Sequence, residues 1–138
     1  MSYTLVYSTA ETLYKITLSG RVAAHEIGQA FLQVAQGGEG PASANLIWDF
    51  RDADLRDINF NDVVSLLRVR LDMNARRGSP KVAFLVGSDA AYGKVRMWTN
   101  LLDNEAEITQ QIGLFRDEAE TYAWLRDASA DTQQRNMR

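Results

Sequence analysis

The chain has 138 residues, no cysteine and a single histidine. This length fits one domain, since domains usually hold about 100–200 residues, and such a domain buries enough surface to fold without a disulfide or a structural metal. The lack of cysteine excludes thiol catalysis, disulfides and cysteine-bound zinc or iron–sulfur centres, and one histidine excludes sites that need two imidazoles. We therefore expect no metal and no cofactor.

The charge is distributed unevenly along the chain. The formal net charge is −3, but the segment 51–102 carries nine basic and six acidic side chains, whereas both flanking segments are acidic. This local surplus is too small for nucleic-acid binding, which needs a clearly basic domain or stripe. The first residues do not resemble a signal peptide, and the longest apolar run, 82–86, is far too short to cross a bilayer. We expect a cytoplasmic protein without a membrane span.

Period-two patterns at the start of the chain predict an antiparallel hairpin. The alternating residues are Tyr3, Leu5 and Tyr7, and, after a short link at 9–12, Tyr14, Ile16 and Leu18. The period then changes to that of a helix at 23–36, in which the apolar residues fall on one face. A glycine-rich loop at 37–43 follows, and then a strand at 46–50 that is apolar on nearly both faces, as a central strand should be.

The second half of the chain alternates between helices and strands. A polar loop at 51–58 leads into a helix at 61–77, with Asn59 or Asn61 available as its cap. A second apolar strand, Lys81–Val86, is followed by a helix that begins after Ser88 and reaches about Leu102.

A short strand at 112–115 and a helix at 117–125 complete the pattern. The order ββαβαβαβα predicts an α/β fold with one mixed sheet of about five strands, parallel in its later strands and covered by helices. We assign the domain to residues 1–126. The polar segment 127–138 is expected to be a disordered tail.

Four segments of the chain carry a recognisable fold pattern. They are Asn45-Leu46-Ile47-Trp48-Asp49-Phe50, Phe60-Asn61-Asp62, 81–87 with Ser88-Asp89-Ala90-Ala91-Tyr92-Gly93, and Leu114-Phe115-Arg116-Asp117-Glu118-Ala119 with Ala123-Trp124-Leu125. Together they resemble the STAS domains of anti-sigma-factor antagonists, and more closely the stage II sporulation protein AA-like branch, whose sheet is related to that of the CRAL-TRIO lobe. The resemblance covers roughly residues 3–125 and implies a regulatory protein.

The resemblance also implies a regulatory position, from which this sequence departs. The antagonists are phosphorylated on a serine in a motif close to Asp-Ser-Ser-Gly-Leu at the start of a helix. Alignment on Phe60-Asn61-Asp62 puts Val63 and Val64 at the hydroxyl positions and Ser65 at the glycine. Valine cannot accept phosphate, and Ser65 lies about a turn inside the helix. The usual phosphorylation switch is therefore not expected at this position.

Polar side chains follow two strands that are expected to be parallel. Asp49 lies near the end of the first, Ser88 and Asp89 follow the second, and Tyr92 lies one turn into the next helix. Because α/β folds bind ligands at this edge of the sheet, these four residues predict a cleft for a ligand or a partner. The alternative is structural, with Ser88 as a helix cap and Asp89 as a complement to the helix dipole.

Five aspartates between positions 49 and 62 form an acidic cluster. The cluster lacks the glycine and the terminal glutamate of a calcium-binding loop, and Arg51 and Arg56 interrupt it. We therefore predict an ion-paired loop at the surface rather than a metal site.

Arg70 interrupts the apolar side of the predicted helix at 61–77. Helical spacing places it on the same face as Leu66, Leu67 and Leu71. A buried charge without a partner is prohibitive, so Arg70 either extends past the sheet edge or contacts a second subunit or a ligand. We predict a homodimer, with Arg70 and Arg96 at an interface.

Two functions from different classes fit these observations. The first is a non-enzymatic regulatory or scaffolding protein that acts through protein–protein contacts. The second is a carrier or sensor of a small apolar or amphipathic ligand bound between sheet and helices, by analogy with the CRAL-TRIO lobe. An enzyme that uses Asp49, Ser88 and Asp89 is a third hypothesis, which no catalytic motif in the sequence supports.

Overall fold

The structure, a computed structural model, describes residues 3–41, 43–66, 68, 80–103 and 111–127. Its elements are, in chain order, β1 Tyr3–Ser8, β2 Leu13–Arg21, α1 Ala24–Ala35, β3 Asn45–Asp54, β4 Lys81–Val86, α3 Asp89–Asp103, β5 Gln111–Phe115 and α4 Glu118–Arg126. A further helical segment covers residues 60–66, between β3 and β4. The predicted order of strands and helices is confirmed.

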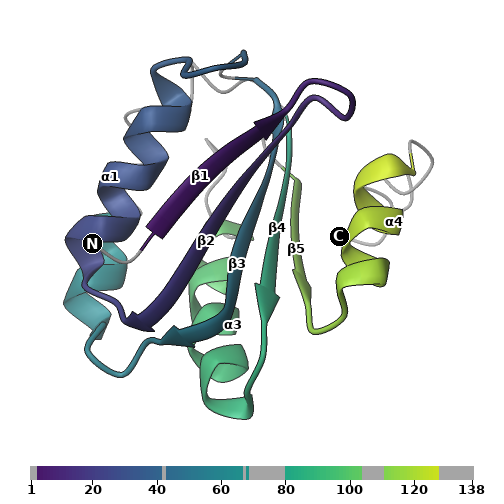
Figure 1. The fold of residues 1–138 in the computed structure, drawn as a ribbon. Coiled ribbons are helices and arrows are strands. Elements are labelled where there is room, and N and C mark those ends of the chain that lie inside the picture. The colour runs from purple at the N-terminus through teal and green to yellow at the C-terminus, as the bar shows by residue number, and fades with distance from the viewer. Residues whose placement is uncertain (1–2, 42, 67, 69–79, 104–110, 128–138) are drawn as a thin grey trace.

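The five strands form one mixed sheet in the order β1-β2-β3-β4-β5. Strand β1 pairs with β2 in an antiparallel hairpin, and β2, β3, β4 and β5 run parallel to one another. The predicted α/β class, the five-stranded mixed sheet and its parallel later strands are therefore confirmed. The carboxyl ends of the four parallel strands lie along one edge of the sheet, which we call the carboxyl edge; it is at the bottom of Figure 1.

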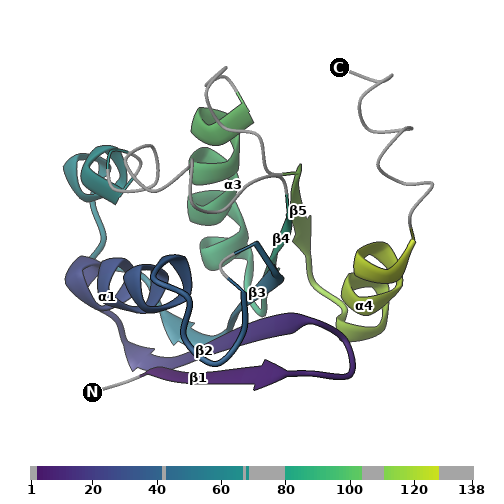
Figure 2. The same cartoon turned by 90° about the horizontal axis from the view of Figure 1, so that it is seen from above.

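The strand order explains where the helices pack. From β2 onward, each crossover steps to the next strand in the same direction. Because such crossovers are right-handed, every crossover helix lies on the same face of the sheet. Helices α1 and α3 and the helix at 60–66 accordingly share one face in Figure 2. Helix α4 follows the last strand and makes no crossover, so it is free to pack on the opposite face, where Figure 2 shows it.

The main core lies under α1 and α3. At its centre, the rings of Trp48 and Phe50 from β3 and Phe84 from β4 are stacked, with centroids 5.9–6.3 Å apart. The indole of Trp98 from α3 meets Phe50 edge-on at 5.7 Å. A second, smaller core under α4 consists of Leu13, Ile47, Ala83 and Leu125.

Strand β3 is longer than the sequence predicts. Residues 51–54, expected at the start of a polar loop, continue the strand because they pair with the end of β2: Ser19 with Asp52, Gly20 with Ala53 and Arg21 with Asp54. The other described ends agree with the predicted ones to within a few residues.

Parts of the sequence-based prediction lie outside the described residues. These are residues 67 and 69–77 of the helix predicted at 61–77, which include Arg70, and residues 128–138 of the predicted tail. Within the described ranges, no helix combines the length and the apolar character that crossing a membrane requires.

Candidate functional site

The carboxyl edge brings together segments that follow all four parallel strands. Arg21 ends β2, the loop at 55–59 follows β3, Ser88 follows β4 and Arg116 follows β5. Folds with parallel strands usually bind their ligands and partners at this edge, because loops there are free to vary while the strands hold them in place.

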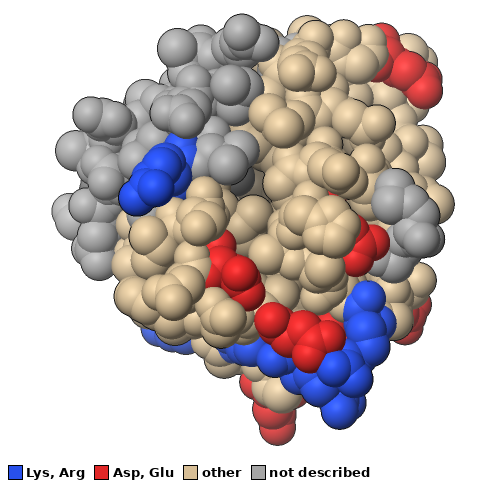
Figure 3. Space-filling model, turned by 90° about the vertical axis from the view of Figure 1, so that its left-hand side faces the viewer, with Lys and Arg blue, Asp and Glu red and all other residues tan. Residues whose placement is uncertain are grey.

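Ion pairs hold the loop after β3 in place. The guanidinium of Arg21 donates two hydrogen bonds to Asp57, of 2.9 and 2.6 Å, and lies 4.0 Å from Asp54. Arg56 lies 2.8 Å from the same Asp54 carboxylate. Hydrogen bonds from Arg56 and Arg21 lower the pKa of Asp54 and Asp57, respectively. Of the five aspartates predicted to form an ion-paired loop, Asp54 and Asp57 are paired in this way. Figure 3 shows acidic and basic side chains side by side at the lower end of the view.

Backbone groups of the same loop are held as well. The ammonium group of Lys94 on α3 donates to the carbonyl oxygens of Leu55 at 2.9 Å and Ile58 at 2.6 Å. Asn59 and Asp62 form a reciprocal capping box, each side chain accepting from the other's backbone N–H at 2.9 Å. Asn59 is thus the cap of the helix that begins at residue 60.

Phe60 stands at the end of this rigid loop with its ring in solvent. Its side chain is 57% exposed, although it is large and apolar. Helical spacing puts it on the same side as Val63, which is buried. Phe60 is the first residue of the helix at 60–66 and directly follows the loop at the carboxyl edge.

Three of the predicted cleft residues lie at the carboxyl edge. Ser88 caps α3, its hydroxyl accepting from the backbone N–H of Ala91 at 3.1 Å. Asp89 is exposed and pairs with Arg116 at 2.6 Å, and the same guanidinium lies 4.7 Å from the ring centroid of Tyr92. Arg116, which the sequence-based interpretation missed, therefore links Asp89 to Tyr92.

Asp49 lies on the other face of the sheet and does not join this group. It alternates with Trp48 and Phe50, whose rings face α3, so its own side chain faces α4. It is 4% exposed and accepts hydrogen bonds from Arg51 of 3.0 and 2.8 Å. Lys15 lies 3.8 Å away, and Glu118 on α4 contacts Lys15 and Arg51 at 3.2 Å each.

The environment of Asp49 keeps it ionised. Burial alone would raise its pKa, but the hydrogen bonds from Arg51 and the charge of Lys15 outweigh this effect, so the pKa lies below its usual value. A carboxylate held between two cations is a poor general base. No group of three acidic or histidine side chains is arranged to hold a metal ion among the described residues.

The remaining predicted interface residues are placed as follows. Arg96 is exposed on α3 and lines, with Tyr92, Leu114 and Trp124, a pocket of about 320 Å³ beside the outer strand β5. Arg70 lies outside the described residues.

Val63, which aligns with a phosphorylated serine of the antagonists, is 3% exposed. Its side chain is therefore buried as well as lacking a hydroxyl.

Solved structures share this architecture. A protein of the DUF3478 family with a SpoIIAA-like fold, from Shewanella loihica PV-4, has a TM-score of 0.57 at 13% identity, covering 90% of this chain and 92% of that chain. An anti-sigma factor antagonist from Mycobacterium paratuberculosis has a TM-score of 0.58 at 15% identity, covering 91% and 96%. No protein-family model and no curated protein matches the sequence.

The fold is thus SpoIIAA-like and of the STAS type, as the sequence predicts. At identities of 13% and 15%, the likeness establishes the fold and leaves the function to be argued from the site itself.

Proposed function

We propose that this protein is a non-enzymatic regulator that binds a partner protein in the cytoplasm through its carboxyl edge, with Phe60 at the centre of the contact. The observation that carries this proposal is the exposed ring of Phe60, which directly follows a loop held by polar contacts. Interface cores are enriched in aromatic residues and are surrounded by a polar rim.

The rigidity of the loop favours binding. Because Lys94 and the capping box hold the backbone on both sides of Phe60, little conformational entropy is lost when a partner covers the ring. The surrounding ion pairs of Arg21 and Arg56 supply a polar rim that can set partner specificity. The structural likeness to an anti-sigma factor antagonist also supports a regulatory role.

The groups that could serve an enzyme have structural roles here. The hydroxyl of Ser88 caps α3, and the carboxylate of Asp49 is bound to Arg51 on the far face of the sheet. A carrier of apolar ligands is also less well supported, because the pocket between the sheet and α1 is lined by tyrosine, glutamine and glutamate side chains.

Charge introduced at Phe60 tests the proposal. We expect Phe60→Asp to weaken binding of the partner by at least about 30-fold, since losing an interface hot spot costs about 2 kcal/mol or more. The matched control is Val6→Asp, because Val6 on β1 is 61% exposed and lies away from the carboxyl edge. The partner is first isolated by affinity purification and identified, and its affinity for each purified variant is then measured by calorimetry.

The two variants distinguish the proposed surface from other exposed surfaces. Partner binding that survives Phe60→Asp, or that is lost equally with Val6→Asp, would contradict a partner site at the carboxyl edge. Both substitutions replace exposed side chains, so the melting temperatures of both variants are expected to stay close to that of the wild type.

The predicted homodimer is part of the same proposal and is tested separately. Arg70→Ala is expected to shift the elution volume from dimer to monomer or to lower the free energy of unfolding by a few kcal/mol, because the sequence pattern predicts this arginine on an apolar helix face, where it would need a partner. Arg68→Ala, which removes an exposed arginine, is the control. An unchanged elution volume and melting curve for Arg70→Ala would show that this residue has no interface role.

A further inference from the structure

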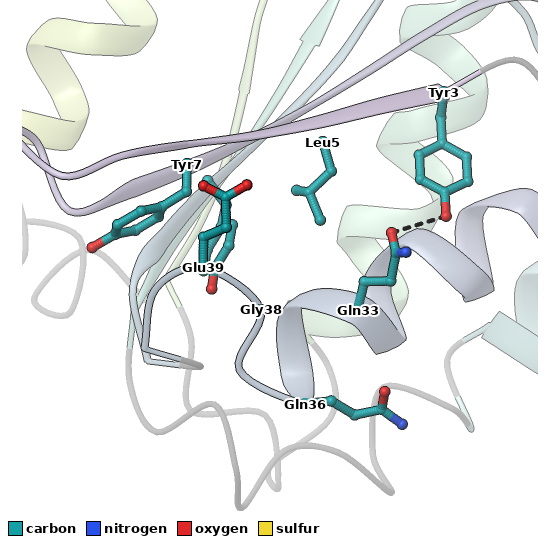
Figure 4. A pocket seen from close by; sticks show the side chains of 8 residues that line it. Tyr3, Leu5, Tyr7, Gln33, Gln36, Gly38 and Glu39 are labelled. Atoms are coloured by element: carbon teal, nitrogen blue, oxygen red, sulfur yellow. Dashed lines mark hydrogen bonds between the residues drawn. The ribbon is translucent and has the colours of Figure 1, made fainter.

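A further pocket, which the sequence did not suggest, lies beside β1, the strand at the opposite edge of the sheet from β5. It is an open pocket bounded by the edge strand β1, the carboxyl-terminal part of α1 and the loop that follows α1, and its volume is about 690 Å³. Figure 4 shows Tyr3, Leu5 and Tyr7 extending from the same side of β1. This volume falls within the range of about 300–1,000 Å³ typical of small-molecule sites.

Hydrogen bonds hold the aromatic walls of this pocket. The hydroxyl of Tyr14 accepts from the backbone N–H of Gly40 at 2.7 Å and donates to the carbonyl oxygen of the same residue. The ring of Tyr7 lies 4.8 Å from that of Tyr14, at an angle of 50°. At the other end of the pocket, Tyr3 donates to Gln33 of α1 at 2.9 Å, the dashed line in Figure 4.

The loop after α1 can approach these rings because Gly40 has no side chain. A Cβ atom at this position would overlap the ring of Tyr7. The glycine therefore allows the loop to close over the aromatic residues, and it brings its neighbour Glu39 to the pocket wall. Figure 4 shows the side chain of Glu39 extending toward β1.

Glu39 is the only charged residue among those that line the pocket. It is exposed, and no cation in the described part of the chain pairs with it. The other lining side chains are three tyrosines, two glutamines and one leucine. The faces of aromatic rings carry negative electrostatic potential and attract cations. The rings and the carboxylate of Glu39 therefore both favour a positively charged ligand.

We infer that this pocket is a binding site for a small organic cation of the quaternary ammonium class. Such a cation has a weakly hydrated, partly apolar surface that suits tyrosine rings, and its charge is complemented by Glu39. An anion would be repelled by the carboxylate of Glu39, and a lipid tail would leave this charge without a partner in the pocket. The site is independent of the carboxyl edge and goes beyond the proposed partner binding.

Choline and its neutral isostere 3,3-dimethyl-1-butanol test the inference on the full chain. Calorimetry or titration of tyrosine NMR signals is expected to show saturable binding of choline and at least about tenfold weaker binding of the isostere, which has the same shape without the charge. Tetramethylammonium is expected to bind as well, since the charged group itself is what the pocket recognises.

Variants of the pocket locate the binding. Glu39→Gln removes the charge at an exposed loop position, and Tyr7→Leu removes one ring face while keeping an apolar side chain; each is expected to weaken choline binding about threefold to tenfold. Glu120→Gln, the same charge change on α4, is expected to have no effect. Melting curves establish that each variant is folded. Absent choline binding, equal binding of the neutral isostere, or unchanged affinity in Glu39→Gln would each overturn the inference.

Discussion

Replacing Phe50 with alanine is expected to lower the free energy of unfolding by about 3–5 kcal/mol. The ring is fully buried at the centre of the main core. It stacks with Trp48 and Phe84, at 5.9 and 6.1 Å, and meets Trp98 of α3 edge-on. Its removal leaves a cavity between three large rings that the sheet and α3 hold apart, so the surrounding side chains can refill little of the space.

A second phenylalanine offers a matched control for this prediction. Phe60→Ala makes the same chemical change at an exposed position and is expected to alter stability by no more than about 0.5 kcal/mol. Urea unfolding followed by tryptophan fluorescence measures both variants. A loss below about 1 kcal/mol for Phe50→Ala, or similar losses for the two variants, would contradict the described core.

Replacing Asp49 with asparagine is the second change with a large expected effect. It removes the negative charge that accepts the hydrogen bonds of Arg51, and we expect a loss of about 1.5–3 kcal/mol at neutral pH. Because the side chain of Arg51 is partly exposed, solvent screens part of the interaction. The arginine left behind can still contact Glu118, which keeps the loss below that of a fully enclosed ion pair.

The effect of Asp49→Asn is expected to depend on pH. The pKa of Asp49 lies below its value in the unfolded chain, about 3.9, so the folded state binds this proton less readily. Its contribution to stability is therefore complete above about pH 5 and is lost as the pH falls through the folded-state pKa. The stability difference between wild type and Asp49→Asn should shrink between pH 7 and pH 3.

Urea unfolding of both proteins at the two pH values measures this difference. The comparison with the variant is needed because the pKa values of Asp54 and Asp57 are also lowered, and their contributions cancel between the two proteins. A difference that is the same at pH 7 and pH 3 would show that Asp49 is not held as a charged acceptor.

The order of the elements could be predicted because the hydrophobic period changes clearly along the chain. The alternation of Tyr3, Leu5 and Tyr7 predicts a strand, and Ser88 before an apolar helical pattern predicts a cap, which its hydrogen bond to Ala91 confirms. Residues 51–54 differ from the sequence-based prediction because their charges are typical of a loop; only their pairing with β2 makes them a strand.

The sites were harder to predict because they depend on how elements meet. Strand alternation puts Asp49 on the opposite face of the sheet from Trp48 and Phe50. Which face carries α3 depends on the strand order, and the sequence does not determine that order. Phe60 shares a helical face with the buried Val63 and is nevertheless exposed. The tyrosine pocket depends on contact between Gly40 and Tyr14, 26 positions apart.

Contact between Phe60 and a partner protein can be measured directly by photo-crosslinking. A benzoylphenylalanine placed at position 60 projects from the carboxyl edge, and the same group at Val6 projects from β1 with similar exposure. We expect irradiation in the presence of the purified partner to give a strong covalent adduct from position 60 and little or none from position 6. An adduct from position 6 alone, or equal adducts from both, would contradict a regulator that binds its partner through the carboxyl edge.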